Sequence, residues 1–191
     1  MGTISSSECA EAESMQRGKT GPFVTIYATA HRVEVVATPF GPGVPGVRAH
    51  HTSVIVDDTE FSFDMNGITY GPPLFSHRCY RTEPSVMYVG LSAISADAML
   101  QALGSFFAAG SYDLLRKNCN SFSDCALYCL LDTRLDPRFR SVEQIGHAAD
   151  NSVGLIQAIT DGNYRPNPLA DGFEVEKVVK YLDMVKVQLG F

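Results

Sequence analysis

Asn118, Cys119 and Asn120 are the residues of this sequence that point most clearly to chemistry. Asn118 suits the position just before a helix, and the apolar residues after it recur at helical spacing, so a helix is expected to begin at Cys119. The unpaired backbone N–H groups and partial positive charge of a helix start favour a thiolate over a thiol. Cys119 is therefore a candidate nucleophile. The alternative is a buried free cysteine that only fills the core.

A nucleophilic cysteine also needs an imidazole within hydrogen-bond reach. His50 and His51 precede the β-branched run 52–56, which predicts a strand. Neighbouring residues of a strand point to opposite faces, so only one of these two histidines is expected to address Cys119. The other histidines are predicted to be surface or loop residues: His31, His77 and His147.

Four segments resemble the PPPDE family of permuted papain-fold thiol peptidases, whose best-known members are desumoylating isopeptidases. In chain order they are HTSVIV, EFSFDMNGI, GPP and YDLLRKNCNSFS, and the resemblance extends from about residue 23 to 145. It implies a Cys-His dyad, which falls on Cys119 and His51, and a papain-like fold in which the histidine precedes the cysteine. The chain departs from the family at His50, where the best-known members carry an aromatic residue. The resemblance also implies a homodimer.

The supporting groups of this dyad are open at the sequence level. Asn118 or Asn120 could stabilise an oxyanion with a side-chain amide, or could act only as a helix cap and loop hydrogen-bonder. Glu60 matches an acidic position of the family motif, with a structural role at a strand edge as the alternative. No paired C-x-x-C spacing appears, so neither a metal nor a cofactor is expected; Cys125 and Cys129 are predicted to be core residues.

The resemblance implies hydrolysis of the isopeptide bond between ubiquitin, or a ubiquitin-like modifier such as SUMO, and a lysine side chain. The same dyad could instead hydrolyse a thioester, as in removal of palmitate from a cysteine. A third reading is a scaffold that binds modifiers without turnover, because a fold does not dictate a function.

The composition of the 191 residues favours one globular domain. Hydrophobic residues make up 45% and charged residues 19%, and the net charge of −6 argues against a nucleic-acid surface. Five cysteines are an odd number, and with no secretory leader recognised they indicate free thiols in a reducing compartment. A cytoplasmic location is expected, with the nucleus or a membrane surface as further options.

The first residues of the chain suggest a route to a membrane. Residues 1–21 lack an apolar period and are expected to form a flexible tail. The start MGTISS fits the N-myristoylation pattern, with Gly2 as the acceptor, and Cys9 is close enough to carry a palmitoyl group as a second anchor.

The pattern of the whole chain predicts strands first and helices afterwards. Strands are expected at 23–28, 32–38, 51–56, 59–64 and 85–91, with 41–46 as a turn-rich connector, a break at 66–67 and a loop from 71. Helices are expected from 95 to 110, from 119 to 131, at 141–145 and at 173–189. This order predicts an α+β fold with a small antiparallel sheet or partial barrel packed against helices, including the helix with Cys119. The predicted domains are a peptidase domain at 22–150 and a C-terminal helical extension at 151–191 packed on it.

Overall fold

The computed structural model describes residues 29–44, 47–140, 162 and 164–189. Several predictions lie outside these residues, namely the tail at 1–21 with Gly2 and Cys9, the strand at 23–28, the helix at 141–145 and the position of His147.

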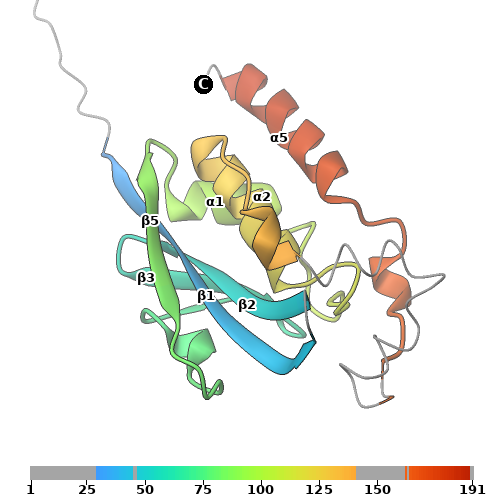
Figure 1. The fold of residues 1–191 in the computed structure, drawn as a ribbon. Coiled ribbons are helices and arrows are strands. Elements are labelled where there is room, and N and C mark those ends of the chain that lie inside the picture. Colours follow the sequence, from blue (N-terminus) through green and yellow to red (C-terminus); the bar gives the residue numbers. More distant parts are fainter. Residues whose placement is uncertain (1–28, 45–46, 141–161, 163, 190–191) are drawn as a thin grey trace, which may run out of the picture.

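An antiparallel sheet of five strands forms one layer of the structure (Figure 1). The order across the sheet is β4-β3-β2-β1-β5, and every neighbouring pair is antiparallel. The strands are β1 (His31–Val44), β2 (Val47–Val56), β3 (Thr59–Asp64), β4 (Gly67–Gly71) and β5 (Ser85–Ser92).

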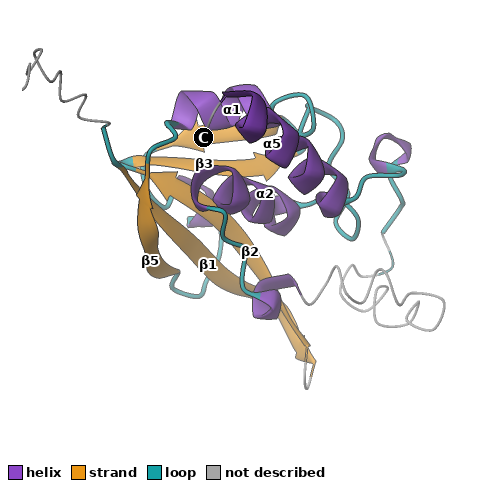
Figure 2. Cartoon of the chain, turned by 90° about the horizontal axis from the view of Figure 1, so that it is seen from above, coloured by secondary structure: helices purple, strands orange, loops and turns teal. Residues whose placement is uncertain are grey.

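The helices lie on one side of this sheet, as the view from above shows (Figure 2). They are α1 (Ala96–Leu103), α2 (Cys119–Leu131) and α5 (Val175–Leu189). Short 3-10 turns are η1 (Phe75–His77), η2 (Pro137–Arg140) and η4 (Pro168–Ala170). The predicted α+β class, with the cysteine helix packed on an antiparallel sheet, is confirmed.

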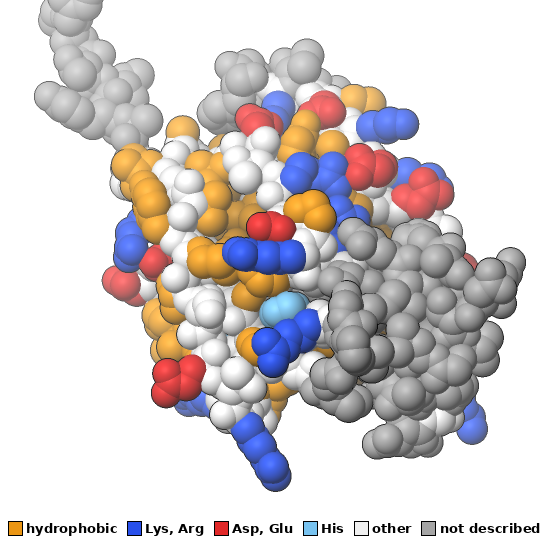
Figure 3. All heavy atoms as spheres, in the orientation of Figure 1, with side chains coloured by type: hydrophobic (Ala, Val, Ile, Leu, Met, Phe, Trp, Pro, Cys, Tyr) orange, Lys and Arg blue, Asp and Glu red, His pale blue; other side chains and the backbone are white. Residues whose placement is uncertain are grey.

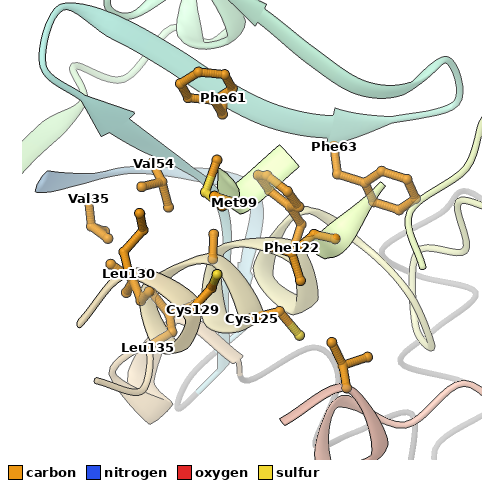
Figure 4. Close-up of a cluster of buried hydrophobic side chains, with 14 of the residues drawn as sticks. Val35, Val54, Phe61, Phe63, Met99, Phe122, Cys125, Cys129, Leu130 and Leu135 are labelled. Carbon is orange, nitrogen blue, oxygen red and sulfur yellow. The ribbon is translucent and has the colours of Figure 1, made fainter. Parts of the chain in front are cut away.

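The core lies between the sheet and α2 (Figure 4). Alternate strand residues such as Val35, Val54 and Phe61 meet the apolar side of α2, because a strand exposes every second residue to the same face. Cys125 and Cys129 are part of this cluster, as the sequence predicted. The C-terminal helix α5 joins the same cluster through its buried residues Val175, Val178, Val179 and Leu182.

Several predicted boundaries differ from the structure. Strand β1 continues into the expected connector 41–46 as far as Val44, and β2 begins at Val47, ahead of the predicted start at 51. The predicted break at Asn66-Gly67 is confirmed, because β3 ends at Asp64, but the strand β4 that follows was not predicted; Gly67 has φ 92°, and Asn-Gly is a common hairpin signal. Helix α1 ends at Leu103 with Gly104 as its C-cap, ahead of the predicted end at Gly110.

The edge strand β5 carries apolar side chains that face solvent. Val86, Tyr88 and Leu91 are exposed, and hydrophobic side chains gather on the side of the molecule where Figure 1 draws this strand (Figure 3). Among the described residues, no helix combines the length and the apolar character needed to cross a membrane.

Candidate active site

Asn118 caps the helix that carries the candidate nucleophile. Its side-chain Oδ1 accepts hydrogen bonds from the backbone N–H groups of Asn120 and Ser121, at 2.9 and 3.1 Å. The Ser121 hydroxyl in turn accepts from the Asn118 N–H at 3.3 Å, which completes a capping box. Helix α2 therefore begins at Cys119, as predicted, and Asn118 has the capping role.

The start of α2 lies against a part of β2 that has no pairing with β3. Strand β3 pairs with β2 only at Val54–Val56, whereas β2 begins seven positions earlier at Val47. Thr52 lies in the part without β3, and its hydroxyl is 2.9 Å from both the Asn120 Oδ1 and the Ser123 hydroxyl. Asn120 therefore links α2 to β2. This part of β2 is the part that faces the start of the cysteine helix.

Cys119 is buried in a polar and aromatic environment. Its Sγ lies 3.8 Å from the Oδ1 of Asn120, and only 5% of the residue is exposed. A small pocket at this point is lined by Phe40, His50 and Tyr112, together with Leu114 and the residues of the Asn118-Cys119-Asn120 segment. A substrate would have to enter here to reach the thiol.

Two tyrosines that the sequence did not single out have pKa values that depend in part on Cys119. The pKa of Tyr112 is raised well above its ordinary value, mainly by burial and next by the charge of Cys119. A hydrogen bond between Tyr112 and the Cys119 thiol is a smaller cause. Burial and then the charge of Cys119 also raise the pKa of Tyr80. Both phenols therefore stay protonated at neutral pH and can donate hydrogen bonds at the site.

His51 is a buried histidine on the face of β2 opposite to Thr52. Its Nε2 lies 2.8 Å from the hydroxyl of Ser76, its ring stacks on Tyr80 with centroids 5.2 Å apart, and the ring of His77 is 4.6 Å away. Burial, with a smaller effect of His77, lowers the pKa of His51 to about 3. At neutral pH the ring is therefore uncharged and has one nitrogen free to accept a proton.

His50, the alternative base, lies on the Thr52 face of β2. Its Nδ1 is 3.0 Å from the backbone oxygen of Arg48, and its ring meets Phe139 edge to face. Burial is the main cause of its lowered pKa. His50 lines the small pocket together with Cys119, whereas His51 is not among its lining residues.

Tyr80 contacts one residue of the predicted dyad. Its ring stacks on His51, and the charge of Cys119 is a secondary cause, after burial, of its raised pKa. His51 and Cys119 come from a strand and a helix that lie far apart in the sequence. The dyad itself stays a prediction, as do the chemical roles of Asn118 and Asn120.

A family model described as "PPPDE putative peptidase domain" matches residues 23–159. The chain belongs to this PPPDE family. Similar proteins include Desumoylating isopeptidase 1 of Xenopus laevis, 39% identical over 79 residues, and of Homo sapiens, 33% identical over 78 residues. Each match covers 39% of this chain and 45% of the relative, so the chain matches less than half the length of these relatives.

Within this PPPDE domain the structure corrects the predicted location of His77 and shows that Ser76, which was not predicted, is one of the residues around His51. His77 was expected on the surface or in a loop, yet it is buried in η1 with 3% exposure. Its ring nitrogens lie 2.7 Å from the Thr38 hydroxyl and 2.9 Å from the Ser53 hydroxyl. Ser76, beside it, was not singled out, because serines in a turn carry no sequence signal for a partner brought from another strand.

Proposed function

We propose that this chain is a cysteine isopeptidase that removes a ubiquitin-like modifier from lysine side chains, with Cys119 as nucleophile and His51 as general base. The observation that carries the proposal is the capped start of α2, which presents the Cys119 thiol at a helix N-terminus and is linked through Asn120 to Thr52, the residue that follows His51 on β2. Membership in a peptidase family adds independent support. SUMO is the modifier we favour, because the similar proteins are named desumoylating isopeptidases.

In this reaction His51 takes the proton of the Cys119 thiol, and Sγ attacks the carbonyl carbon of the modifier's C-terminal residue. The isopeptide C–N bond breaks, the lysine amine leaves with the proton from His51, and a thioester remains on Cys119. Water then attacks this thioester, which releases the modifier with a free carboxylate and restores the thiol. The phenol of Tyr112, hydrogen-bonded with the Cys119 thiol, is a donor that would stabilise the oxyanion; one such donor typically contributes about 3 kcal/mol.

The test uses SUMO and ubiquitin probes that carry a thiol-reactive group at the C-terminus. We expect a covalent adduct with SUMO on the wild-type protein and none on Cys119→Ala. His51→Ala should lose nearly all labelling and conjugate cleavage while its fold, followed by circular dichroism, is retained. Cys129→Ala removes a buried thiol from the same helix and is the matched control that should still be labelled.

The same experiment separates the alternatives. If His50→Ala loses labelling while His51→Ala is still labelled, the general base is His50. Labelling by the ubiquitin probe alone would identify ubiquitin, in place of SUMO, as the modifier that is removed. With no labelling by either probe, hydrolysis of a palmitoyl thioester by the wild-type protein would indicate the thioesterase, and inactivity on both substrates would leave a modifier-binding scaffold.

Location and assembly are further proposals. We propose that Gly2 is myristoylated and that Cys9 is palmitoylated, which would add a membrane-associated pool to a cytoplasmic one. Metabolic labelling with alkyne fatty acids should mark the wild-type protein, and Gly2→Ala should lose the myristate label. A homodimer, implied by the family resemblance, is tested by light scattering of the purified protein.

A further inference from the structure

A buried chain of polar side chains leads away from the imidazole of His51, on the face of the sheet opposite to α2. His51 Nε2 lies 2.8 Å from the hydroxyl of Ser76 in η1. The same hydroxyl donates a 2.5 Å hydrogen bond to Oε1 of Glu60 on β3. Three residues from three different elements thus form one continuous line, Glu60, Ser76 and His51.

The direction of these hydrogen bonds fixes the tautomer of His51. A serine hydroxyl has a single proton, and here that proton goes to the Glu60 carboxylate, which accepts only. The contact between Ser76 and His51 must then be donated by the Nε2–H of the imidazole. Nδ1 is left with its lone pair, so Nδ1 is the ring atom able to take the proton of the nucleophilic thiol.

Glu60 occupies an environment that a purely structural carboxylate rarely has. The residue is fully buried, with 0% exposure, and its Oε2 has no hydrogen-bond partner among the described residues. Its other close neighbour is His77, with Nε2 at 3.7 Å from Oε1. A buried carboxylate with an unpaired oxygen is costly to maintain, and its negative potential acts on whatever positive charge forms nearby.

We propose, building on the function proposed above, that Ser76 and Glu60 are positioning residues that hold the His51 ring and stabilise its imidazolium form when the thiolate is generated. Neutral His51 is the resting state because its ring is buried. When the ring accepts the Cys119 proton, Nε2–H stays bonded to Ser76, and the Glu60 charge behind that hydroxyl offsets the new positive charge. The other titratable groups around His51 are His77, in ring contact, and Tyr80, stacked on it.

The test measures the alkylation rate of Cys119 by iodoacetamide between pH 5 and 9, followed by mass spectrometry on the full-length protein. In alkylation the sulfur forms a bond to the reagent carbon, iodide leaves, and the thiol proton passes to His51, so no modifier is needed. Loss of a hydrogen bond to a charged group predicts that Ser76→Ala is about tenfold slower at pH 6. The acid limb of its pH–rate profile should move up by about one pH unit.

Matched variants separate positioning from a general effect on the fold. Ser76→Thr keeps the hydroxyl and should react at close to the wild-type rate, whereas Glu60→Gln should shift the acid limb in the same direction as Ser76→Ala. Ser62→Ala makes the same change at a buried serine of β3 and should leave the profile unchanged. In a His51→Ala background Ser76→Ala should cause no further loss.

Two results would overturn the proposal. One is an acid limb of the pH–rate profile in Ser76→Ala that matches the wild type. The other is a fall in alkylation rate on adding Ser76→Ala to His51→Ala that is as large as the fall caused by Ser76→Ala in the wild type. Neither result depends on whether a modifier is cleaved. Conversely, an absence of probe labelling together with the predicted alkylation profile would refute the isopeptidase and leave the positioning of His51 intact.

Discussion

At the residue scale, the cap of α2 is a single side chain with two duties. Asn118 satisfies two backbone N–H groups and also donates from Nδ2 to the Leu114 oxygen at 2.8 Å. It therefore holds both the helix start and the loop before it, and with them the position of the Cys119 thiol.

Asn118→Ala should lower the free energy of unfolding by about 1 kcal/mol and also slow the alkylation of Cys119, because a lost cap frays the first turn. Urea denaturation and mass spectrometry measure the two effects. Ser95→Ala removes the N-cap of α1 and is the control: a similar loss of stability is expected there with unchanged Cys119 reactivity. Equal reactivity of Asn118→Ala and wild type would contradict the link between cap and thiol.

His51 also predicts how the stability of the fold depends on pH. The folded pKa of about 3 lies below the ordinary value of 6.5, so the unfolded state binds the proton more readily. The stabilisation that results is complete above pH 6.5 and is lost progressively as the pH falls toward 3.

Between pH 7 and pH 5 this one group should cost about 2 kcal/mol of unfolding free energy. Urea titrations at the two pH values measure it. His51→Gln cannot titrate, so its stability should fall by correspondingly less over the same interval. A variant with the full wild-type pH dependence would show that His51 is not the group responsible.

At the element scale, the segment before α5 secures the loop that leads to the nucleophile. The Asn167 side chain donates to the backbone oxygens of Gly110 and Tyr112, at 2.7 and 2.8 Å. Asp113, in the same loop, accepts from the Asn167 N–H at 2.8 Å and from the Tyr164 hydroxyl at 3.0 Å. The C-terminal residues beyond the family match thus support the site.

Asn167→Ala should cost about 3 kcal/mol of stability, since three side-chain hydrogen bonds are lost, two donated to backbone oxygens and one accepted from the Leu169 N–H. It should also increase amide hydrogen exchange across residues 110–118 and slow probe labelling of Cys119. Gln101→Ala, at an exposed position of α1, is the control for a lost amide and should change neither measurement. Unaltered exchange in the loop would contradict the supporting role of this segment.

At the scale of the whole molecule, one buried carboxylate ties three distant parts of the chain together. Asp124 on α2 is fully buried and accepts from Arg134 at 2.9 and 2.8 Å and from Arg140 at 2.8 Å. Arg134 also reaches Glu176 of α5 at 2.8 Å. The cysteine helix, the segment after it and the C-terminal helix therefore share one charge network.

Asp124→Asn should destabilise the protein by about 3 kcal/mol, because it leaves two arginines without the buried charge that they face. Thermal and urea unfolding measure the loss, and α5 should become more accessible to proteases. Asp97→Asn, at an exposed position in the first turn of α1, is the matched control and should have a small effect. A change of less than 1 kcal/mol in Asp124→Asn would show that the network contributes little.

Local sequence signals correctly predicted the elements that carry the site. The N-cap at Asn118, the alternation in β3 and the β-branched run of β2 are properties of a few neighbouring residues, so they are visible before the chain folds. The family resemblance selected Cys119 and His51 in the same way. A strand was missed where a local signal had two meanings, as at Asn66-Gly67, which was correctly predicted to break β3 but also turns the chain into β4.

Only the tertiary structure decided what surrounds the two predicted residues. The contacts of His51 with Ser76 and Tyr80, and of Ser76 with Glu60, join positions that pairing and turns bring together, and no spacing in the sequence encodes such a meeting. The same holds for Thr52 against Asn120 and for Asn167 against the loop before Cys119. Residue type and spacing set the chemistry that the chain can offer, whereas burial, which neutralises His51 and removes water from Glu60, arises only when the sheet and the helices close over them.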